Sequence, residues 1–140
     1  MTGWLKDDLT VALDEVDRSA SRIVTIHDDL AAIATDPGVA RRLRERGERH
    51  RQALVAFNHA RRSAGQTPEV GDPERAHLQS LWLALKAAVA GEHSEERLQQ
   101  SLADLDEELH AAIRAARQHP LGDSVRRALD GLAAELTRPV

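Results

Sequence analysis

Apolar residues recur at helical spacing along almost the whole of this 140-residue chain. Each of five segments carries them as one stripe, so each segment needs packing partners on one side only. Since short connections between long helices make sequential neighbours antiparallel, the pattern predicts an all-α, antiparallel four-helix bundle in a single domain over residues 1–140. The segments run over about residues 4–34, 38–64, 73–90, 94–118 and 123–137.

Proline and glycine mark the ends of these segments. The Asp-Pro pairs at 36–37 and 72–73 each join a residue suited to the helix N-cap to a proline suited to the first helical position. Gly65 and Gly91 stand where glycines end helices. We therefore expect one real loop, over residues 65–72, and short breaks elsewhere.

The composition agrees with helices. Only 2% of the residues are aromatic, whereas strands favour aromatic and β-branched side chains. The absence of cysteine excludes a disulfide framework, a thiolate metal site and a cysteine nucleophile. No apolar run approaches the roughly 20 residues that a membrane span needs, and the first residues do not match a signal peptide. We therefore expect a cytoplasmic protein without a membrane partner.

The first two segments carry opposite charge. Residues 1–34 contain three basic and seven acidic side chains, a net charge of −4, and residues 38–64 contain eight arginines and two glutamates, a net charge of +6. Two such neighbouring helices are expected to complement each other. We expect the arginines on a solvated, partly salt-bridged face at non-core angles. No aromatic platform interleaves with them, so nucleic acid is not an expected partner.

Three stretches carry a resemblance to a known family. They are LRERGERHRQAL at 43–54, SAGQTPEV at 63–70 and HLQSLWLALKAAVAG at 77–91. With them the chain resembles, over roughly residues 9–137, a bacterial ferritin-like family of unknown function. The resemblance implies a four-helix bundle whose third helix is broken near Gly91. The five segments would then form four bundle members.

Ferritin-like bundles that hold two metal ions use inward carboxylates from two helices and Glu-x-x-His pairs from the other two. The resemblance implies glutamates near Asp17, Glu48 and Asp106. It also implies a tyrosine where Ile113 stands. Two of the three acidic positions hold the shorter aspartate, the tyrosine is missing, and the last segment contains no histidine. We therefore expect a degenerate site without stoichiometric iron or ferroxidase activity.

Two histidines fall on apolar stripes. His27 and His50 should point into the core, offset along the helix axes by roughly 7 Å, which suits a bridging group better than a direct pair. As a metal set they would act with nearby acids, namely Asp17, Glu48 and Asp106. The alternative is that both are core or boundary histidines satisfied by a carboxylate or water. A weakly held divalent ion is the one cofactor that this set allows.

Other candidate sites have little support. Glu74 with His77, and Glu107 with His110, have the Glu-x-x-His spacing. Glu107 lies opposite the apolar stripe of its segment, and Glu74 stands at a helix start, where carboxylates are favoured anyway. No sequence motif of a nucleophile or a phosphate-binding loop is present. The sequence therefore favours a protein that is not an enzyme.

Three functions remain open at this point. The first is a non-catalytic helical bundle that works by association, as a homo-oligomer or with another helical protein. The second is a ferritin-like protein that binds iron or zinc through the core histidines and nearby carboxylates. The third is an enzyme of a type that the sequence does not identify. The buried core is expected to contain Leu13, Val16, Ile23, Leu43, Leu54, Phe57, Leu81, Trp82, Leu85, Leu102, Leu105, Leu109, Leu129 and Leu132.

Overall fold

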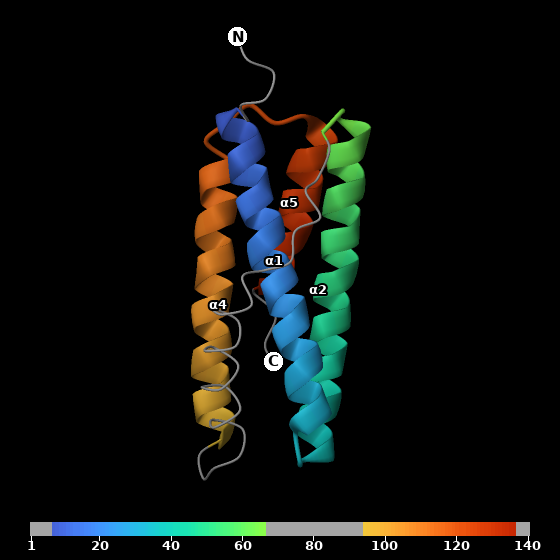
Figure 1. The fold of residues 1–140 in the computed structure, drawn as a ribbon, viewed down its shortest axis with the longest axis vertical. Helices are drawn as coiled ribbons and strands as arrows, with labels where there is room; N and C mark the ends of the chain where they lie inside the picture. Colours follow the sequence, from blue (N-terminus) through green and yellow to red (C-terminus); the bar gives the residue numbers. More distant parts are fainter. Residues whose placement is uncertain (1–6, 67–93, 137–140) are drawn as a thin grey trace.

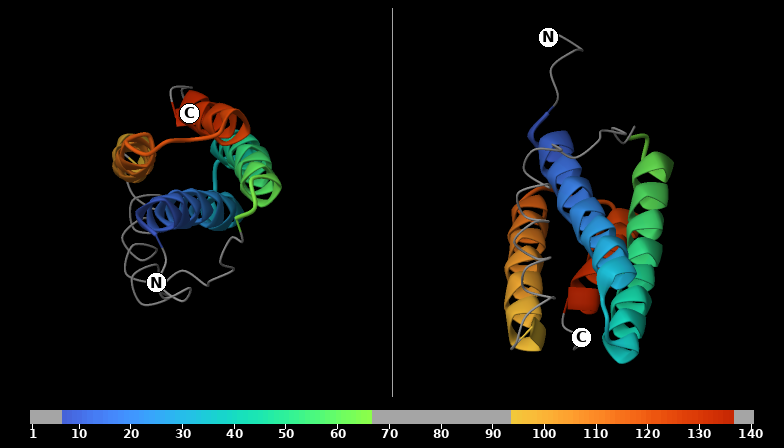
Figure 2. Two further views of the ribbon diagram at one scale, coloured as in Figure 1. Left: turned by 90° about the horizontal axis from the view of Figure 1, so that it is seen from above. Right: turned by 60° about the horizontal axis from the view of Figure 1, so that its bottom comes forward.

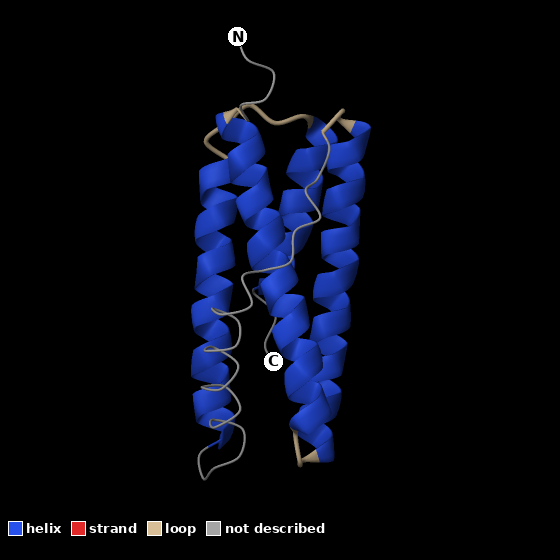
Figure 3. Ribbon diagram, viewed as in Figure 1, coloured by secondary structure: helices blue, strands red, loops and turns tan. Residues whose placement is uncertain are grey.

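The computed structural model describes residues 7–66 and 94–136 (Figure 1). These two stretches form helices and connections without any strand (Figure 3), which confirms the all-α prediction for them. The expected helix at 73–90, most of the loop at 65–72 and the break near Gly91 lie outside the described residues. The helices are α1 (Asp8–Ile33), α2 (Pro37–Ser63), α4 (Ser94–Ala116) and α5 (Asp123–Leu136).

The four helices stand around a common core (Figure 2). α1 packs against both α2 and α4, and α2 packs against α5, whereas α4 and α5 form the loosest of these packed pairs. α1 and α2 run in opposite directions. Their contacts show this, since Asp14 near the start of α1 bonds to Arg61 near the end of α2. None of the described helices is long and apolar enough to cross a membrane.

Two aspartates begin the first two helices. The Asp7 carboxylate accepts a hydrogen bond from the backbone N–H of Thr10 at 2.7 Å. Asp36 accepts one from the N–H of Gly38 at 2.8 Å, with Pro37 as the first residue of α2. Each carboxylate satisfies a backbone donor that a helix start leaves unpaired. The predicted Asp-Pro start at 36–37 is confirmed.

A glycine follows the end of α2. Gly65 has φ of +85°, in the left-handed region that favours glycine. Its N–H donates to the Arg62 carbonyl at 3.0 Å, and the Gln66 N–H donates to the Arg61 carbonyl at 2.9 Å. This pair of bonds is the Schellman pattern of helix ends, and it confirms the predicted role of Gly65.

The core is built from the predicted stripes. Ten of the expected core residues are buried, Leu54 packs against the core at partial exposure, and three lie outside the described residues (Leu81, Trp82 and Leu85). The buried ones are Leu13, Val16, Ile23, Leu43, Phe57, Leu102, Leu105, Leu109, Leu129 and Leu132.

The expectation that the α2 arginines stay at non-core angles is wrong for two of them. Arg46 and Arg61 are among the largest fully buried side chains of the described residues. Buried charges need charged or hydrogen-bonding partners, and both arginines find theirs on neighbouring helices. The predicted complementarity of α1 and α2 is visible in two ion pairs, Arg61 with Asp14 and Arg51 with Asp28.

Candidate functional site

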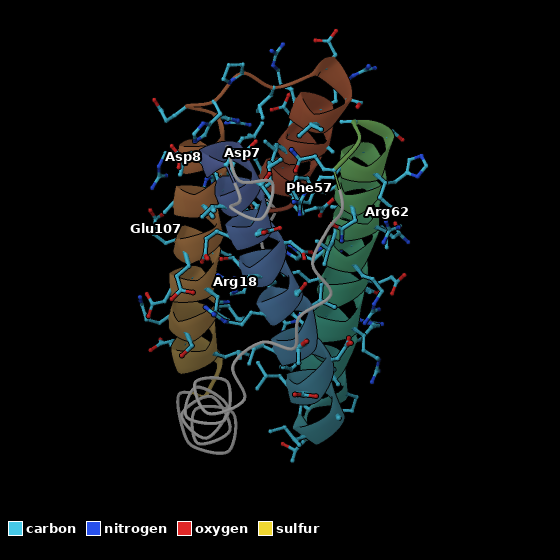
Figure 4. The ribbon with its side chains drawn as sticks, turned by 45° about the horizontal axis from the view of Figure 1, so that its top comes forward. Asp7, Asp8, Arg18, Phe57, Arg62 and Glu107 are labelled. Atoms are coloured by element: carbon cyan, nitrogen blue, oxygen red, sulfur yellow. The ribbon has the colours of Figure 1, made fainter. Side chains whose placement is uncertain are left out.

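The inward stripe of α2 is polar in its middle. Arg46 is 1% exposed and His50 is 0% exposed, and they lie between the apolar Leu43 and Phe57 on the same stripe. Other charged side chains lie on the outward side of the helices, and Figure 4 shows Arg62 and Glu107 extending away from α2 and α4. The candidate site is therefore an internal polar cluster, enclosed by apolar side chains.

His27 on α1 is the first partner of Arg46. Its Nδ1 lies 2.7 Å from the carbonyl oxygen of Ile23, so this nitrogen carries the proton and donates it. The lone pair of Nε2 is then free to accept, and it accepts a hydrogen bond from Nη1 of Arg46 at 2.7 Å. The ring is fixed in one tautomer, and its only lone pair in the ring plane is directed at a guanidinium.

Asp106 on α4 is the second partner. Its Oδ2 accepts a hydrogen bond from Nη2 of Arg46 at 2.6 Å. Burial raises the pKa of Asp106, although the charge and hydrogen bond of Arg46 oppose that effect. The guanidinium thus binds one acceptor on α1 and one on α4 while its own backbone lies in α2.

His50 is the fourth polar side chain of the cluster. Its ring centroid lies 5.7 Å from that of His27, with the two rings tilted by 33°. Among the described residues, neither ring nitrogen of His50 has a hydrogen-bond partner. Burial lowers the pKa of His50 to about 3 and that of His27 to about 4, and the charge of Arg46 adds to both effects. Both rings are therefore neutral near pH 7.

A glycine brings α1 and α2 together at this level. A Cβ built on Gly47 would stand 3.0 Å from Cβ of His27 and 3.5 Å from Oδ1 of Asp28. Any side chain at position 47 would push against α1. The close approach that Gly47 permits places His27 within reach of Arg46, the residue just before the glycine.

Arg61 forms a second buried site, nearer the end of α2. Its Nη2 donates to Oδ1 of Asp14 at 2.9 Å and to Oε1 of Gln66 at 3.2 Å. Its guanidinium carbon lies 5.8 Å from the centre of the Phe57 ring, within the range of a cation–π contact. This site ties α1 to α2 and to the residue that follows the Schellman turn.

The five predicted metal ligands do not all meet. His27 and Asp106 bind the Arg46 guanidinium, and His50 lies beside the His27 ring. Asp17 accepts a hydrogen bond from Asn58 and lies ten residues from His27, about 15 Å along α1. Glu48 is exposed and pairs with Arg51.

No metal-binding group is formed by these residues as they stand. Within residues 7–66 and 94–136, no three or more His, Cys, Asp or Glu side chains are arranged to hold a metal ion. Glu107 faces outward as expected, since it is exposed and bonds to Arg114, whereas His110 is half-buried. Glu74 and His77 lie outside the described residues.

A surface hollow lies on α2 outside the core. It has a volume of about 410 Å³ and is lined by Arg44, Glu45, Glu48 and Arg49. The lining alternates in charge, and Arg49 is further bonded to Glu135 of α5 at 3.2 Å. Equal numbers of positive and negative groups give this hollow no net preference for an anion or a cation.

Arg46 is the residue that the sequence interpretation missed. It stands three residues after Leu43 and four before His50, which places it on the apolar stripe. Arg61 stands four residues after Phe57 on the same stripe. The spacing places both arginines on the apolar stripe. The sequence interpretation considered only the net charge of the whole helix, and this sum does not distinguish inward from outward arginines.

The comparisons add no relative. Compared with protein-family models, curated proteins and solved structures, the chain shows no significant match to any of them.

Proposed function

We propose that this chain is a non-catalytic helical-bundle protein that acts through association, with a second copy of itself or with another helical protein. The observation that carries the proposal is the Arg46 guanidinium between His27 and Asp106. Arg46 engages one imidazole and one carboxylate of the core in internal bonds, which supports a degenerate ferritin-like metal site. The function of this protein is then expected to reside at its surface.

The antiparallel, ferritin-like order of the bundle belongs to the same proposal, including a third helix broken near Gly91. The opposite directions of α1 and α2 support it, as does the position of α1 between α2 and α4. This order would put four amphipathic stripes on one core, which is the usual solution for helices of this length.

The surface offers two apolar side chains for association. Val11 on α1 is 53% exposed and Val55 on α2 is 63% exposed, and they are the large exposed hydrophobic side chains of the described residues. Burying them in an interface removes apolar area from water, at roughly 25 cal/mol per Å².

Sedimentation equilibrium tests the proposal. The wild type is expected to form a reversible dimer, and Val11→Ser/Val55→Ser is expected to weaken it at least tenfold. Ala111→Ser changes an exposed alanine on α4 and serves as the matched control. A wild type that stays monomeric into the millimolar range would exclude self-association. Cross-linking of the valine variants in cell extract would then test a different helical partner.

Divalent-metal binding is the second candidate. The observation that favours it is His50, which is fully buried with both ring nitrogens unpartnered among the described residues, beside His27. Elemental analysis of untagged protein, with iron and zinc added under reducing conditions, separates the two candidates. The association proposal predicts no stoichiometric metal. One or more equivalents per chain, lost in His27→Gln/His50→Gln, would favour the metal protein instead.

A further inference from the structure

The cluster around Arg46 has the composition of a metal site. Two imidazoles and a carboxylate, from His27, His50 and Asp106, are a donor set that suits zinc and other divalent transition metals. They come from three different helices and are largely enclosed, with the Asp106 side chain 18% exposed. A metal ligand must offer a lone pair, so the question is where each lone pair is directed.

Two of these three donors, His27 and Asp106, direct a lone pair at a cation that belongs to the chain. Nε2 of His27 lies 2.7 Å from Nη1 of Arg46, and Oδ2 of Asp106 lies 2.6 Å from Nη2. A metal ion at that position would meet both the guanidinium atoms and their charge. The residues present therefore do not fit a metal while Arg46 keeps this conformation, in line with the lack of a metal-binding group in the described part of the chain.

We propose that this core cluster is a cation site which the chain fills with its own Arg46 guanidinium, in the place of a metal ion. The inference rests on the degenerate site of the proposed function and is independent of association. The donors hold a planar cation through two directed hydrogen bonds. The result is a link between α1, α2 and α4 that requires neither metal supply nor a defined oxidation state.

Arginine suits this position better than other cations of the chain. Its guanidinium stays charged at all physiological pH values and presents separate donors in a fixed plane, so one group can bind acceptors on two helices. Hydrogen bonds between charged partners are also the stronger ones. A lysine would supply a single point charge at the end of a flexible stem.

Removing the guanidinium should convert the cluster into an open cation site. In Arg46→Ala, the His27 and Asp106 acceptors remain while the cation and its stem are gone. Methylguanidinium at millimolar concentration should raise the thermal midpoint of this variant by about 4 °C or more, because a ligand that binds only the folded state stabilises it. Zn²⁺ should do the same, and Co²⁺ should give a visible absorption of about one equivalent per chain.

Three proteins serve as controls. The wild type should show none of these responses, because its own guanidinium occupies the site. Arg46→Met fills the space with an uncharged side chain and should also show none. Arg46→Ala/Asp106→Asn retains the space but loses the carboxylate charge, so both cations should lose their effect. This double variant also accounts for cations that bind histidines at the surface.

The outcomes are decisive in either direction. Stabilisation of Arg46→Ala alone, by both cations, would support the proposal. The proposal is wrong if neither cation stabilises Arg46→Ala, if the double variant responds equally, or if the wild type binds zinc through His27. If Arg46→Ala is unfolded by circular dichroism, the cations should restore its helix, and failure to restore it would also overturn the proposal. None of these results depends on the sedimentation experiment.

Discussion

The two buried arginines of α2 share a stripe but hold different parts of the molecule. Arg46 uses two nitrogens for two acceptors, His27 on α1 and Asp106 on α4. Arg61 places both of its bonds on one nitrogen, toward Asp14 and Gln66. The first is a link across three helices, and the second closes one helix pair near its end. The same residue type therefore differs in role according to where its acceptors lie along the chain.

Arg46→Ala should show the largest effect, a loss of about 3–5 kcal/mol in the free energy of unfolding. Removing one partner leaves the half-buried Asp106 charge without compensation. Urea denaturation measures the change, and Arg44→Ala, an exposed arginine of the same helix, should change stability by less than about 0.5 kcal/mol. Equal effects of the two substitutions would show that the buried link contributes nothing.

Arg61→Ala should cost less, about 2–3 kcal/mol, by the same measurement. One of its two acceptors, Gln66, follows the end of α2 and is only half-buried, so water can replace that lost hydrogen bond more easily than the bond to the buried His27. The loss also removes the cation–π contact with Phe57. A cost larger than that of Arg46→Ala would reverse the comparison, and the end of the helix pair would then be the more important site.

Acid should affect the Arg46 cluster and spare the Arg61 site, which contains no histidine among its described partners. Burial lowers the pKa of His27 to about 4 and of His50 to about 3, below the ordinary value near 6.5. The unfolded state therefore binds more protons in this range. The stability from the neutral rings is present above pH 6.5 and is lost as pH falls toward 4 and then 3.

The free energy of unfolding should fall by about 2 kcal/mol between pH 6 and pH 5, because each histidine contributes a slope of up to about 1.4 kcal/mol per pH unit. Urea denaturation at a series of pH values measures it. His50→Leu should reduce the slope by about half, whereas His59→Leu, an exposed histidine of α2, should leave it unchanged. A slope that is the same in wild type and His50→Leu would mean that His50 stays solvated.

Substitutions of two glycines should have the smallest effects on stability. Only one of the two should stabilise the protein. Gly131 lies in α5 with nothing within 4 Å of an added Cβ among the described residues, so Gly131→Ala should stabilise by about 0.5–1 kcal/mol through helix propensity. Gly47→Ala should lose this gain, because its Cβ would press on His27 at 3.0 Å. Thermal melts of both variants check the difference, and an equal gain would show that α1 can move away freely.

The sequence predicted the helices and the inward direction of His27 and His50, because both follow from the spacing of apolar residues along one segment. It did not predict Arg46 and Arg61, since a hydrophobic pattern treats every arginine as an outward residue. Whether an arginine is buried depends on a partner such as Asp106, which stands 60 positions further along the chain. Spacing within one segment contains no information about that partner.

The candidate site was predicted in part for the same reason. The core histidines were expected to need a carboxylate or a bridging group, and Asp106 stands near His27 through Arg46. Asp17, Glu48 and Asp106 all entered through the family resemblance, and the first two form hydrogen bonds elsewhere, with Asn58 and Arg51. A helical wheel gives only the direction of each side chain around the helix axis. Asp17 and His27 are separated by their distance along the axis of α1, which the wheel does not show.

Gly47 also limits how α1 and α2 can slide past each other. Two helices with regular apolar stripes can shift by one turn and still match stripe to stripe. In this pair, such a shift would bring the side chain of Leu43 or Arg51 to the place where Gly47 now faces His27. Both side chains are much larger than the methyl group that would already stand 3.0 Å from Cβ of His27. The absence of a side chain at Gly47 therefore favours one register of α1 against α2. This register is the one in which Arg46 reaches His27.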